Sequence, residues 1–336
     1  MAGLDFEKPI VETEKKIAEL KRFVSDKKID LTAEIKKLED KLEHLRKDTY
    51  GNLSAWQKVQ IARHPQRPYT LDYISLISTD FIELHGDRSF SDDLAMICGL
   101  AKIDGEKVMF IGHQKGRDIK ENLRRNFGCA HPEGYRKALR IMELAQLRNI
   151  PIVVLIDTPG AYPGIGAEER GQSQAIALNL REMIRIAAPI VAVVIGEGGS
   201  GGALGIGIAD RVCVLENAYY SVISPEGCAA ILWKDGAKAP EAAEVLKLTA
   251  PELLKMGIID DVVPEPLGGA HRDPQKIAGS LKEKVLKHLK ELKSLDTGEL
   301  LRQRYKKFRS MGVFACSSRY FYCWGCCVKA RSMAMT

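Results

Sequence analysis

The sequence predicts an α/β fold, a sheet covered by helices, with a helical arm at each end of the chain. From about residue 69 onward, short β-branched apolar runs alternate with longer helical segments. Two of these runs, Ile152–Ile156 and Ile190–Ile195, are continuously apolar, which is typical of strands covered on both faces. No stretch rich in Pro, Gly or Ser divides the middle of the chain. We therefore expect one domain over residues 59–300.

Residues 1–58 are predicted to form a helical hairpin that packs as an arm against the body or a partner. Ile35, Leu38, Leu42 and Leu45 have the spacing of an amphipathic helix, and a weaker apolar stripe precedes them. The break between the two helices falls at residues 26–30. Two heptads are too few to indicate a coiled coil.

Turn and cap residues mark elements of the core. Asp104-Gly105 predicts a β-hairpin, because a type I′ turn needs positive φ at both central positions. Pro132 opens one helix, and a capping box from Thr249 to Glu252 opens another that Gly257 ends. The expected strands are 95–103, 107–112, 152–156, 190–195, 212–215, 219–222 and 258–263, and the other expected helices are 171–186, 203–209, 274–293 and 297–309.

The net charge of +6 is concentrated at the C-terminal end. Residues 301–314 are read as a basic helix end, and residues 315–336 as an atypical tail of Cys and aromatic residues that we expect to be disordered. Together these segments carry eight cations and no acid, which leaves about −2 on residues 1–300. The body therefore lacks the basic excess of a nucleic-acid-binding protein.

Several classes of protein are not indicated. No stretch approaches the ~18 apolar residues of a membrane span, and the N-terminus lacks the apolar core of a secretory signal. We expect a cytoplasmic protein, in which the scattered Cys98, Cys129, Cys213 and Cys228 are buried thiols. The sequence has neither a P-loop for ATP nor a metal-binding cluster in its body.

The densest motif is Gly196–Gly202, with five glycines in seven residues directly after a buried strand. Such a run indicates positive φ or the close approach of a ligand to the backbone, and N–H groups at a strand-to-helix corner attract negative charge. The segment also fits a dinucleotide fingerprint and a nucleophile elbow. In the second case Ser200 would be followed by Asp260 or Asp261 and then His271, the order of a serine hydrolase.

A second Gly/Pro-rich loop, residues 157–166, follows the other buried strand. Ligands of open α/β sheets bind at such strand ends, so the two loops could each offer one N–H group to a single oxygen. A basic stretch between residues 115 and 125 is either a solvated face or a contact for coenzyme phosphates.

Six separated blocks resemble the carboxyltransferase α-subunit family of bacterial acetyl-CoA carboxylase. The blocks are 127–128, 132–138, 157–172, 196–204, 221–228 and 264–271. They stand in the family's order, and the resemblance spans residues 4–314. Family members end near residues 312–314, so the tail that follows departs from the pattern.

The resemblance implies a ClpP/crotonase-like spiral of repeated ββα units. It also implies an α2β2 heterotetramer with a homologous β subunit that carries a zinc ribbon, without which this chain is inactive. Carboxybiotin would arrive on a biotin carboxyl carrier protein, after ATP is used by biotin carboxylase. The product would be malonyl-CoA from acetyl-CoA, the first committed step of fatty acid biosynthesis.

In this chemistry the biotin ureido group becomes negatively charged and can itself take the α-proton of acetyl-CoA, so no protein base is required. The resemblance implies a backbone oxyanion hole from Gly199, Ser200, Gly201, Gly202, Gly160 and Ala161. Substrate contacts are expected from Tyr162, Gly164, Gly166, Lys115, Arg117, Arg124 and Arg125. No metal is expected in this chain.

Two other functions stay open from the residues alone. One is a serine hydrolase that uses Ser200, Asp260 and His271. The other is a biotin-independent hydratase or isomerase of the crotonase fold, which would need Glu197 or Asp157 aimed at the substrate carbon.

Overall fold

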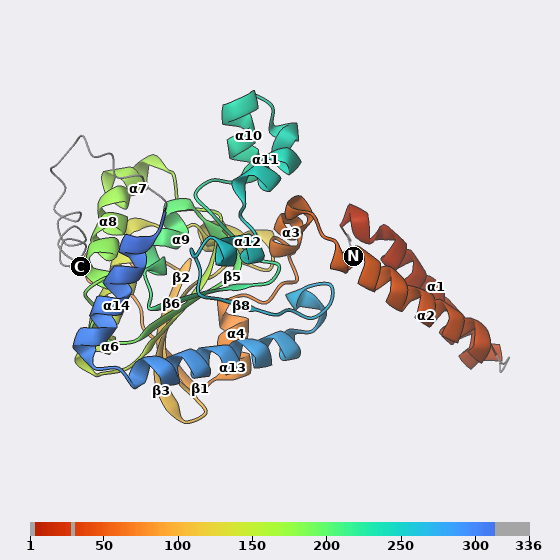
Figure 1. Ribbon diagram of the computed structural model, residues 1–336, viewed down its shortest axis with the longest axis horizontal. Helices are drawn as coiled ribbons and strands as arrows, with labels where there is room; N and C mark the ends of the chain where they lie inside the picture. Colours follow the sequence, from red (N-terminus) through yellow and green to blue (C-terminus); the bar gives the residue numbers. More distant parts are fainter. Residues whose placement is uncertain (1–3, 28–30, 313–336) are drawn as a thin grey trace, which may run out of the picture.

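A mixed sheet forms the centre of the computed structural model, which describes residues 4–27 and 31–312 (Figure 1). The strand order is β1-β2-β3-β4-β5-β6-β8, and β7 pairs with the C-terminal end of β5. The strands β1 to β3 are antiparallel, and the pairs from β3 onward are parallel. The strand bounds are β1 Thr79–Glu83, β2 Met96–Ile103, β3 Glu106–His113, β4 Ile152–Thr158, β5 Ile190–Gly199, β6 Arg211–Leu215, β7 Tyr219–Ser221 and β8 Asp261–Val263.

Two groups of helices pack against this sheet: α6 and α9 form one, with α8 packed on both of them, and α4 and α13 form the other. Every residue of β4 and β5 is buried, as their continuous apolar runs predicted. The helix bounds are α1 Lys8–Lys27, α2 Thr32–Gly51, α3 Ala55–Ala62, α4 Thr70–Ile77, α5 Ile119–Arg124, α6 Pro132–Leu147, α7 Ile165–Glu169, α8 Gln172–Met183, α9 Ser200–Gly207, α10 Pro225–Trp233, α11 Ala239–Leu246, α12 Ala250–Lys255, α13 Pro274–Lys293 and α14 Thr297–Ser310.

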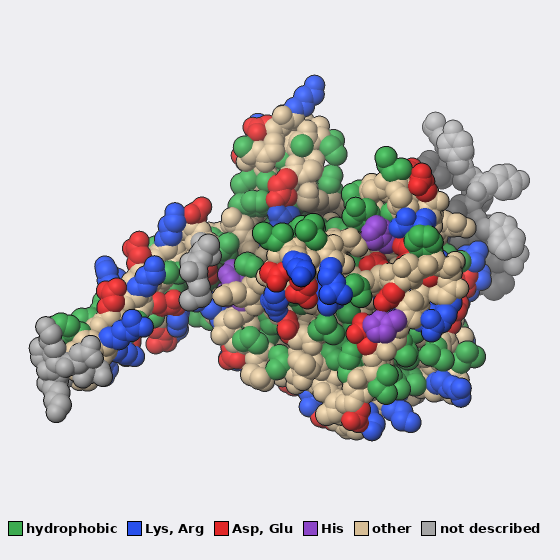
Figure 2. Space-filling model, turned by 180° about the vertical axis from the view of Figure 1, so that it is seen from behind, with side chains coloured by type: hydrophobic (Ala, Val, Ile, Leu, Met, Phe, Trp, Pro, Cys, Tyr) green, Lys and Arg blue, Asp and Glu red, His purple; other side chains and the backbone are tan. Residues whose placement is uncertain are grey.

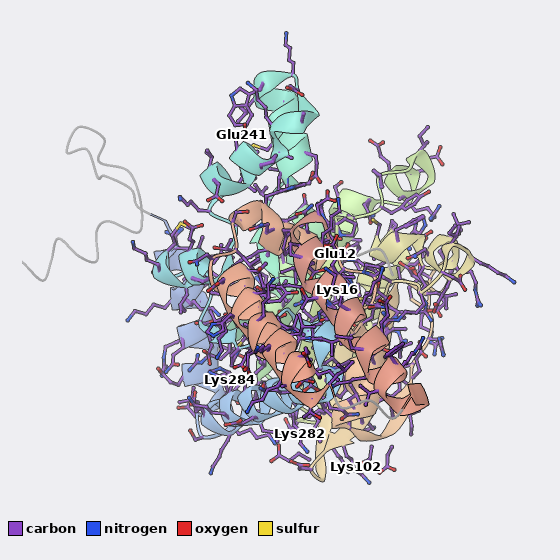
Figure 3. All side chains as sticks on the ribbon, turned by 90° about the vertical axis from the view of Figure 1, so that its right-hand side faces the viewer. Glu12, Lys16, Lys102, Glu241, Lys282 and Lys284 are labelled. Carbon is purple, nitrogen blue, oxygen red and sulfur yellow. The ribbon has the colours of Figure 1, made fainter. Side chains whose placement is uncertain are left out.

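Helices α1 and α2 lie side by side and project from the body (Figures 1 and 3). Ile10, Ile17 and Leu42 are buried between them, and Figure 2 shows charges of both signs over their outer surface. At the base of the arm the buried Glu7 carboxylate accepts a hydrogen bond from the Tyr50 hydroxyl at 2.6 Å. Residues 28–30 of the predicted break lie outside the described residues.

Helices α3 and α14 run across the residues at which the expected body begins and ends. Helix α3 crosses the expected boundary at residues 58/59 and packs against β5, β7 and α11. At the other end α14 begins before residue 301 and buries Leu300 and Arg304, so the basic run is not a uniformly solvated face. The predicted tail, residues 315–336, lies outside the described residues.

Local signals located most turns correctly. Asp104 and Gly105 have φ of 48° and 83° between β2 and β3, which confirms the predicted hairpin. Gly257 has φ of 70° after α12, but the Thr249 hydroxyl lies 3.4 Å from the Glu252 carboxylate and no side-chain bond caps the backbone. The predicted capping box is therefore wrong in its bonding, although the helix begins where expected. Among the described residues no helix is long and apolar enough to cross a membrane.

The four cysteines of the body are free thiols. Cys98, Cys213 and Cys228 are buried, and Cys129 is partly buried. Burial raises the pKa of Cys98 and Cys213 to about 12 and that of Cys129 to about 11. These thiols therefore stay protonated at neutral pH and have little nucleophilic character.

Candidate functional site

The glycine-rich segment is a corner between β5, which ends at Gly199, and α9, which begins at Ser200. None of its five glycines has positive φ; the left-handed residue is Ser200, with φ of 52°. Four of the glycines, all except Gly201, instead lie where a Cβ would come within 3.0 Å of another atom. A Cβ on Gly199 would lie 2.2 Å from the Pro159 carbonyl oxygen, and one on Gly202 would lie 2.4 Å from the Gly160 carbonyl carbon. The backbone of the second loop therefore packs directly against this corner.

The second loop is held in shape by its own first residues. The Thr158 hydroxyl donates to the Gly160 carbonyl at 2.8 Å and accepts from the Gly160 N–H at 3.1 Å. A Cβ on Gly202 would also lie 2.6 Å from the Ala161 nitrogen. Residues Gly160, Ala161 and Gly199–Gly202, which were predicted to act together, are thus brought together by two neighbouring parallel strands.

An apolar groove of about 400 Å³ opens beside the corner. Ser200 and Gly201 form part of its wall, and Gly201 has only Ile176 Cδ1 near its missing Cβ, at 3.7 Å. The remaining lining residues are Leu204, Gly207, Val212, Tyr220, Ser221, Val222, Leu246, Leu253, Met256, Ile258, Phe308 and Met311. Beyond the groove α10 and α11 protrude from the body, and Figure 2 shows hydrophobic side chains on this protrusion. An apolar group can thus lie against the first turn of α9.

A buried ionic cluster lies at the ends of β4 and β5. The Lys115 ammonium is 2.6 Å from Asp157 Oδ1 and 2.9 Å from Glu197 Oε1. Glu197 Oε2 accepts hydrogen bonds from Arg63 Nε and the Tyr219 hydroxyl, both at 2.7 Å. Burial alone would raise the pKa of Glu197, but Lys115 and Arg63 outweigh it and lower that pKa to about 2. Glu197 is therefore ionised and fully paired at neutral pH.

The four predicted basic contacts are placed differently from one another. The Lys115 side chain points into the body and binds Asp157 and Glu197. It was expected to contact coenzyme phosphates instead. The Arg117 guanidinium lies 4.0 Å from the Tyr69 ring and pairs with Asp72, and Arg125 donates to the Leu94 carbonyl at 2.8 Å. The Arg124 side chain is exposed and makes no hydrogen bond or ion pair to another described residue. It is the freest of the four cations.

The remaining predicted contacts lie in the second loop. The Tyr162 N–H donates to the Ala130 carbonyl at 3.1 Å, and its ring lies 4.1 Å from that of His131. A Cβ on Gly164 would be 2.4 Å from the Tyr162 ring, and one on Gly166 would be 3.1 Å from an Arg170 nitrogen. Tyr162 therefore folds back over its own loop.

The hydrolase triad is not assembled. Asp260 accepts from the Val212 N–H at 2.7 Å and from Lys307 at 2.8 Å. His271 stacks on His64 with ring centroids 3.8 Å apart, and its Nδ1 has no hydrogen-bond partner among the described residues. Ser200 makes no hydrogen bond to a described histidine. The alternative acid, Asp261, pairs with Lys284 and His288.

The hydratase alternative also lacks its catalytic group. It needs a carboxylate free to take or give a proton at a substrate carbon. Both candidates, Glu197 and Asp157, are buried and bound to the Lys115 ammonium. The corner thus offers backbone donors without a free carboxylate beside them, and within the described residues no group of His, Cys, Asp and Glu could hold a metal ion.

Comparison with known proteins agrees with this geometry. The family model described as acetyl co-enzyme A carboxylase carboxyltransferase-like matches residues 3–312. The chain belongs to this carboxyltransferase family. Curated relatives named acetyl-coenzyme A carboxylase carboxyl transferase subunit alpha are 59% identical in Geobacter metallireducens and 58% identical in Thermus thermophilus. Each match covers 93% of this chain, with 98% of the first relative and 99% of the second.

Solved structures of low identity share the fold of this carboxyltransferase. Transcarboxylase 12S with hydrolysed methylmalonyl-coenzyme A bound has a TM-score of 0.53 at 18% identity, covering 78% of this chain and 45% of that chain. A Pseudomonas malonate decarboxylase hetero-tetramer in complex with coenzyme A has a TM-score of 0.52 at 14% identity, covering 72% and 91%. The predicted family, crotonase-like fold class and carboxyltransferase activity are confirmed.

Sequence reasoning missed Arg63, Tyr219 and Glu226 at the site. Arg63 follows α3, Tyr219 opens β7 and Glu226 is in α10, and no motif joins these three elements. Two of their partners did carry a signal. Asp157 ends a buried strand and Glu197 interrupts a glycine run, and an acid at either place needs a cation nearby. The identity of that cation depends on long-range packing.

Proposed function

We propose that this carboxyltransferase chain is the α half of a two-chain enzyme that moves a carboxyl group from carboxybiotin to acetyl-CoA, giving malonyl-CoA. The observation that carries the proposal is a pair of contacting loops that present backbone N–H groups without a free carboxylate or an assembled nucleophile. The names of the relatives supply the acyl acceptor. The chemistry of the donors fits an oxyanion.

The oxyanion hole is proposed to use N–H groups of Gly199–Gly202, aided by Gly160 and Ala161. Bound carboxybiotin supplies the carboxyl group, and its ureido oxygen carries negative charge when that group leaves. The corner contributes fixed donors and the positive end of α9, which cost no reorganisation during the reaction. Loss of one such donor costs about 3 kcal/mol of barrier. The apolar groove beside Gly201 has room for the uncharged part of the donor.

The outer contacts are proposed by position and charge. Tyr162, Gly164 and Gly166 shape the second loop beside the donors. Arg124, with Arg117 and Arg125 near it in the sequence, is proposed to meet coenzyme A phosphates or the carrier. Arginine suits phosphate because its planar guanidinium donates two parallel hydrogen bonds.

The proposed assembly is an α2β2 heterotetramer with a zinc-ribbon β subunit in the cytoplasm. Its other partners are the biotin carboxyl carrier protein, which holds the biotin covalently, and biotin carboxylase, which uses ATP. We propose residues 1–58 as an arm of this assembly, residues 59–300 as the carboxyltransferase domain, residues 301–314 as a basic helix end, and residues 315–336 as a tail outside the family pattern.

The test is decarboxylation of malonyl-CoA with free biotin as acceptor. This chain is measured alone and mixed with a zinc-ribbon β subunit, while malonyl-CoA loss and acetyl-CoA formation are followed. Biotin-dependent turnover confined to the mixture is the expected result. Turnover by the lone chain, or turnover indifferent to biotin, contradicts the proposal and returns the question to the hydrolase and hydratase alternatives.

Replacement of Ser200 by alanine is expected to leave turnover of the mixture within about threefold of wild type, because the exposed hydroxyl makes no hydrogen bond to a described residue. A nucleophile removed from a catalytic triad costs about 10⁶-fold in kcat. The measurement is kcat for biotin-dependent decarboxylation by Ser200→Ala beside wild type. A collapse of that size would revive the hydrolase alternative.

A further inference from the structure

We propose that Lys115 is a positioning residue whose ammonium group sets the spacing of the two donor loops. The proposal rests on the proposed function of those loops. Asp157 is the last residue but one of β4, and Glu197 is two residues before the end of β5. Lys115 Nζ contacts a carboxylate on each, at 2.6 and 2.9 Å. A single cation therefore joins both strands where the loops begin.

The strand ladder is irregular at this place. Ile156 pairs with Val194 and Thr158 with Gly198, so β5 contains two extra residues between the two pairs. The gap is closed by side chains, because Asp157 Oδ1 also accepts the Glu197 backbone N–H at 2.9 Å. Gly196 leaves the space for this contact, since a Cβ there would lie 2.6 Å from Asp157 Oδ1. Side-chain contacts, and not a regular ladder, thus hold the two loops in register.

Arg63 completes the arrangement from another direction. It binds Glu197 Oε2 through Nε at 2.7 Å and Glu226 Oε1 of α10 through Nη1 at 2.5 Å. Burial would lower the pKa of Lys115, but Asp157 and Glu197 outweigh it and raise that pKa above its usual range. Lys115 therefore remains a cation across the neutral range and stays bound to both strands.

The spacing of the loops matters for rate more than for binding. Donors must lie about 2.7–3.1 Å from the oxyanion, and a displacement of about 1 Å can cost about 100-fold. Ala161 and Gly202 belong to different loops, so loss of the bridge changes the distance between their donors. If Lys115 met a coenzyme phosphate instead, its loss would weaken binding of malonyl-CoA.

Lys115→Met is the first variant, assayed in the mixture with the β subunit. We expect kcat for biotin-dependent decarboxylation to fall about 100-fold, with KM for malonyl-CoA within about threefold of wild type. Lys107→Met, which removes an exposed lysine from the distant β2–β3 hairpin, is the matched control and is expected to match wild type. A rise in KM at constant kcat would overturn the positioning role in favour of a phosphate contact.

The double variant Lys115→Met/Asp157→Asn distinguishes loss of loop positioning from the effect of an unpaired buried charge. It removes one cation and one anion together, so we expect the urea unfolding midpoint to recover toward wild type while kcat stays low. Recovery of wild-type kcat in this double variant would overturn the proposal.

The dependence of stability on pH tests the bridge without catalysis. In wild type the lowered pKa of Glu197 gives stability above its usual value near 4.5 that is lost as pH falls toward 2. In Lys115→Met, Arg63 and the Tyr219 hydroxyl still contact Glu197, but without the ammonium its pKa lies higher than in wild type. The stability deficit of the variant is therefore expected to be largest above pH 5 and to shrink as pH falls toward 2, and a pH-independent deficit contradicts the bridge. A wild-type mixture without biotin-dependent turnover would instead contradict the proposed function.

Discussion

Gly202→Ala is expected to lower biotin-dependent decarboxylation by about 1000-fold or more in the mixture with the β subunit. A Cβ at this position would lie 2.4 Å from the Gly160 carbonyl carbon and 2.6 Å from the Ala161 nitrogen. Both neighbours are backbone atoms, so no side chain can rotate away, and the two loops must separate. Separation moves the donors of both loops away from one oxygen. The measurement is kcat at saturating malonyl-CoA and biotin.

Two other glycines serve as comparisons for Gly202→Ala. Gly279, on α13, has no atom within 4 Å of its missing Cβ, so Gly279→Ala is expected to keep wild-type turnover. Gly201→Ala meets only the Ile176 side chain at 3.7 Å, so it is expected to fold normally while its methyl group narrows the groove. Wild-type kcat in Gly202→Ala would show that the two loops do not form one site.

The elements that sequence patterns predicted well are those fixed by local chemistry. The continuous apolar runs of β4 and β5 are buried only when helices pack on both faces of the sheet, and Asp104-Gly105 favours the type I′ turn. The protruding helices α10 and α11 were missed because their short apolar stretches resemble strands or loops as much as helices. Length and tertiary contacts, which a pattern does not contain, decide such segments.

The candidate site divides in the same way. The glycine density at residues 196–202 indicated that the backbone itself matters, and the resemblance indicated which N–H groups to consider. Close approach rather than positive φ explains four of the five glycines, all except Gly201, and the left-handed φ falls on Ser200. The basic stretch showed that Lys115 is a cation but not where its side chain points, because Asp157 and Glu197 come close to it only in the folded chain. Arg63 was missed for the same reason.

Arg304→Met is expected to lower the free energy of unfolding by about 3–5 kcal/mol, because it leaves a buried carboxylate without its cation. Arg304 is 1% exposed, and its Nε and Nη2 lie 2.7 Å from the two carboxylate oxygens of Asp210. Its remaining N–H groups donate to the carbonyls of Met183, Ile186 and Ala188 at 2.7 to 2.9 Å. The guanidinium thus fastens α14 to the segment between α8 and β5. The measurement is urea unfolding of the isolated chain.

The loss of stability is expected to be much larger for the buried Arg304–Asp210 pair than for an exposed ion pair of the same helix. Arg302, whose side chain is 71% exposed, pairs with Glu299 one turn away, and Arg302→Met is expected to change stability by less than about 0.5 kcal/mol. Arg304→Met/Asp210→Asn removes the unpaired charge and is expected to regain part of the loss, although the Met183, Ile186 and Ala188 carbonyls still lack their donor. A loss below about 1 kcal/mol in Arg304→Met would mean that water reaches Asp210 and that the α14 end of the body is open.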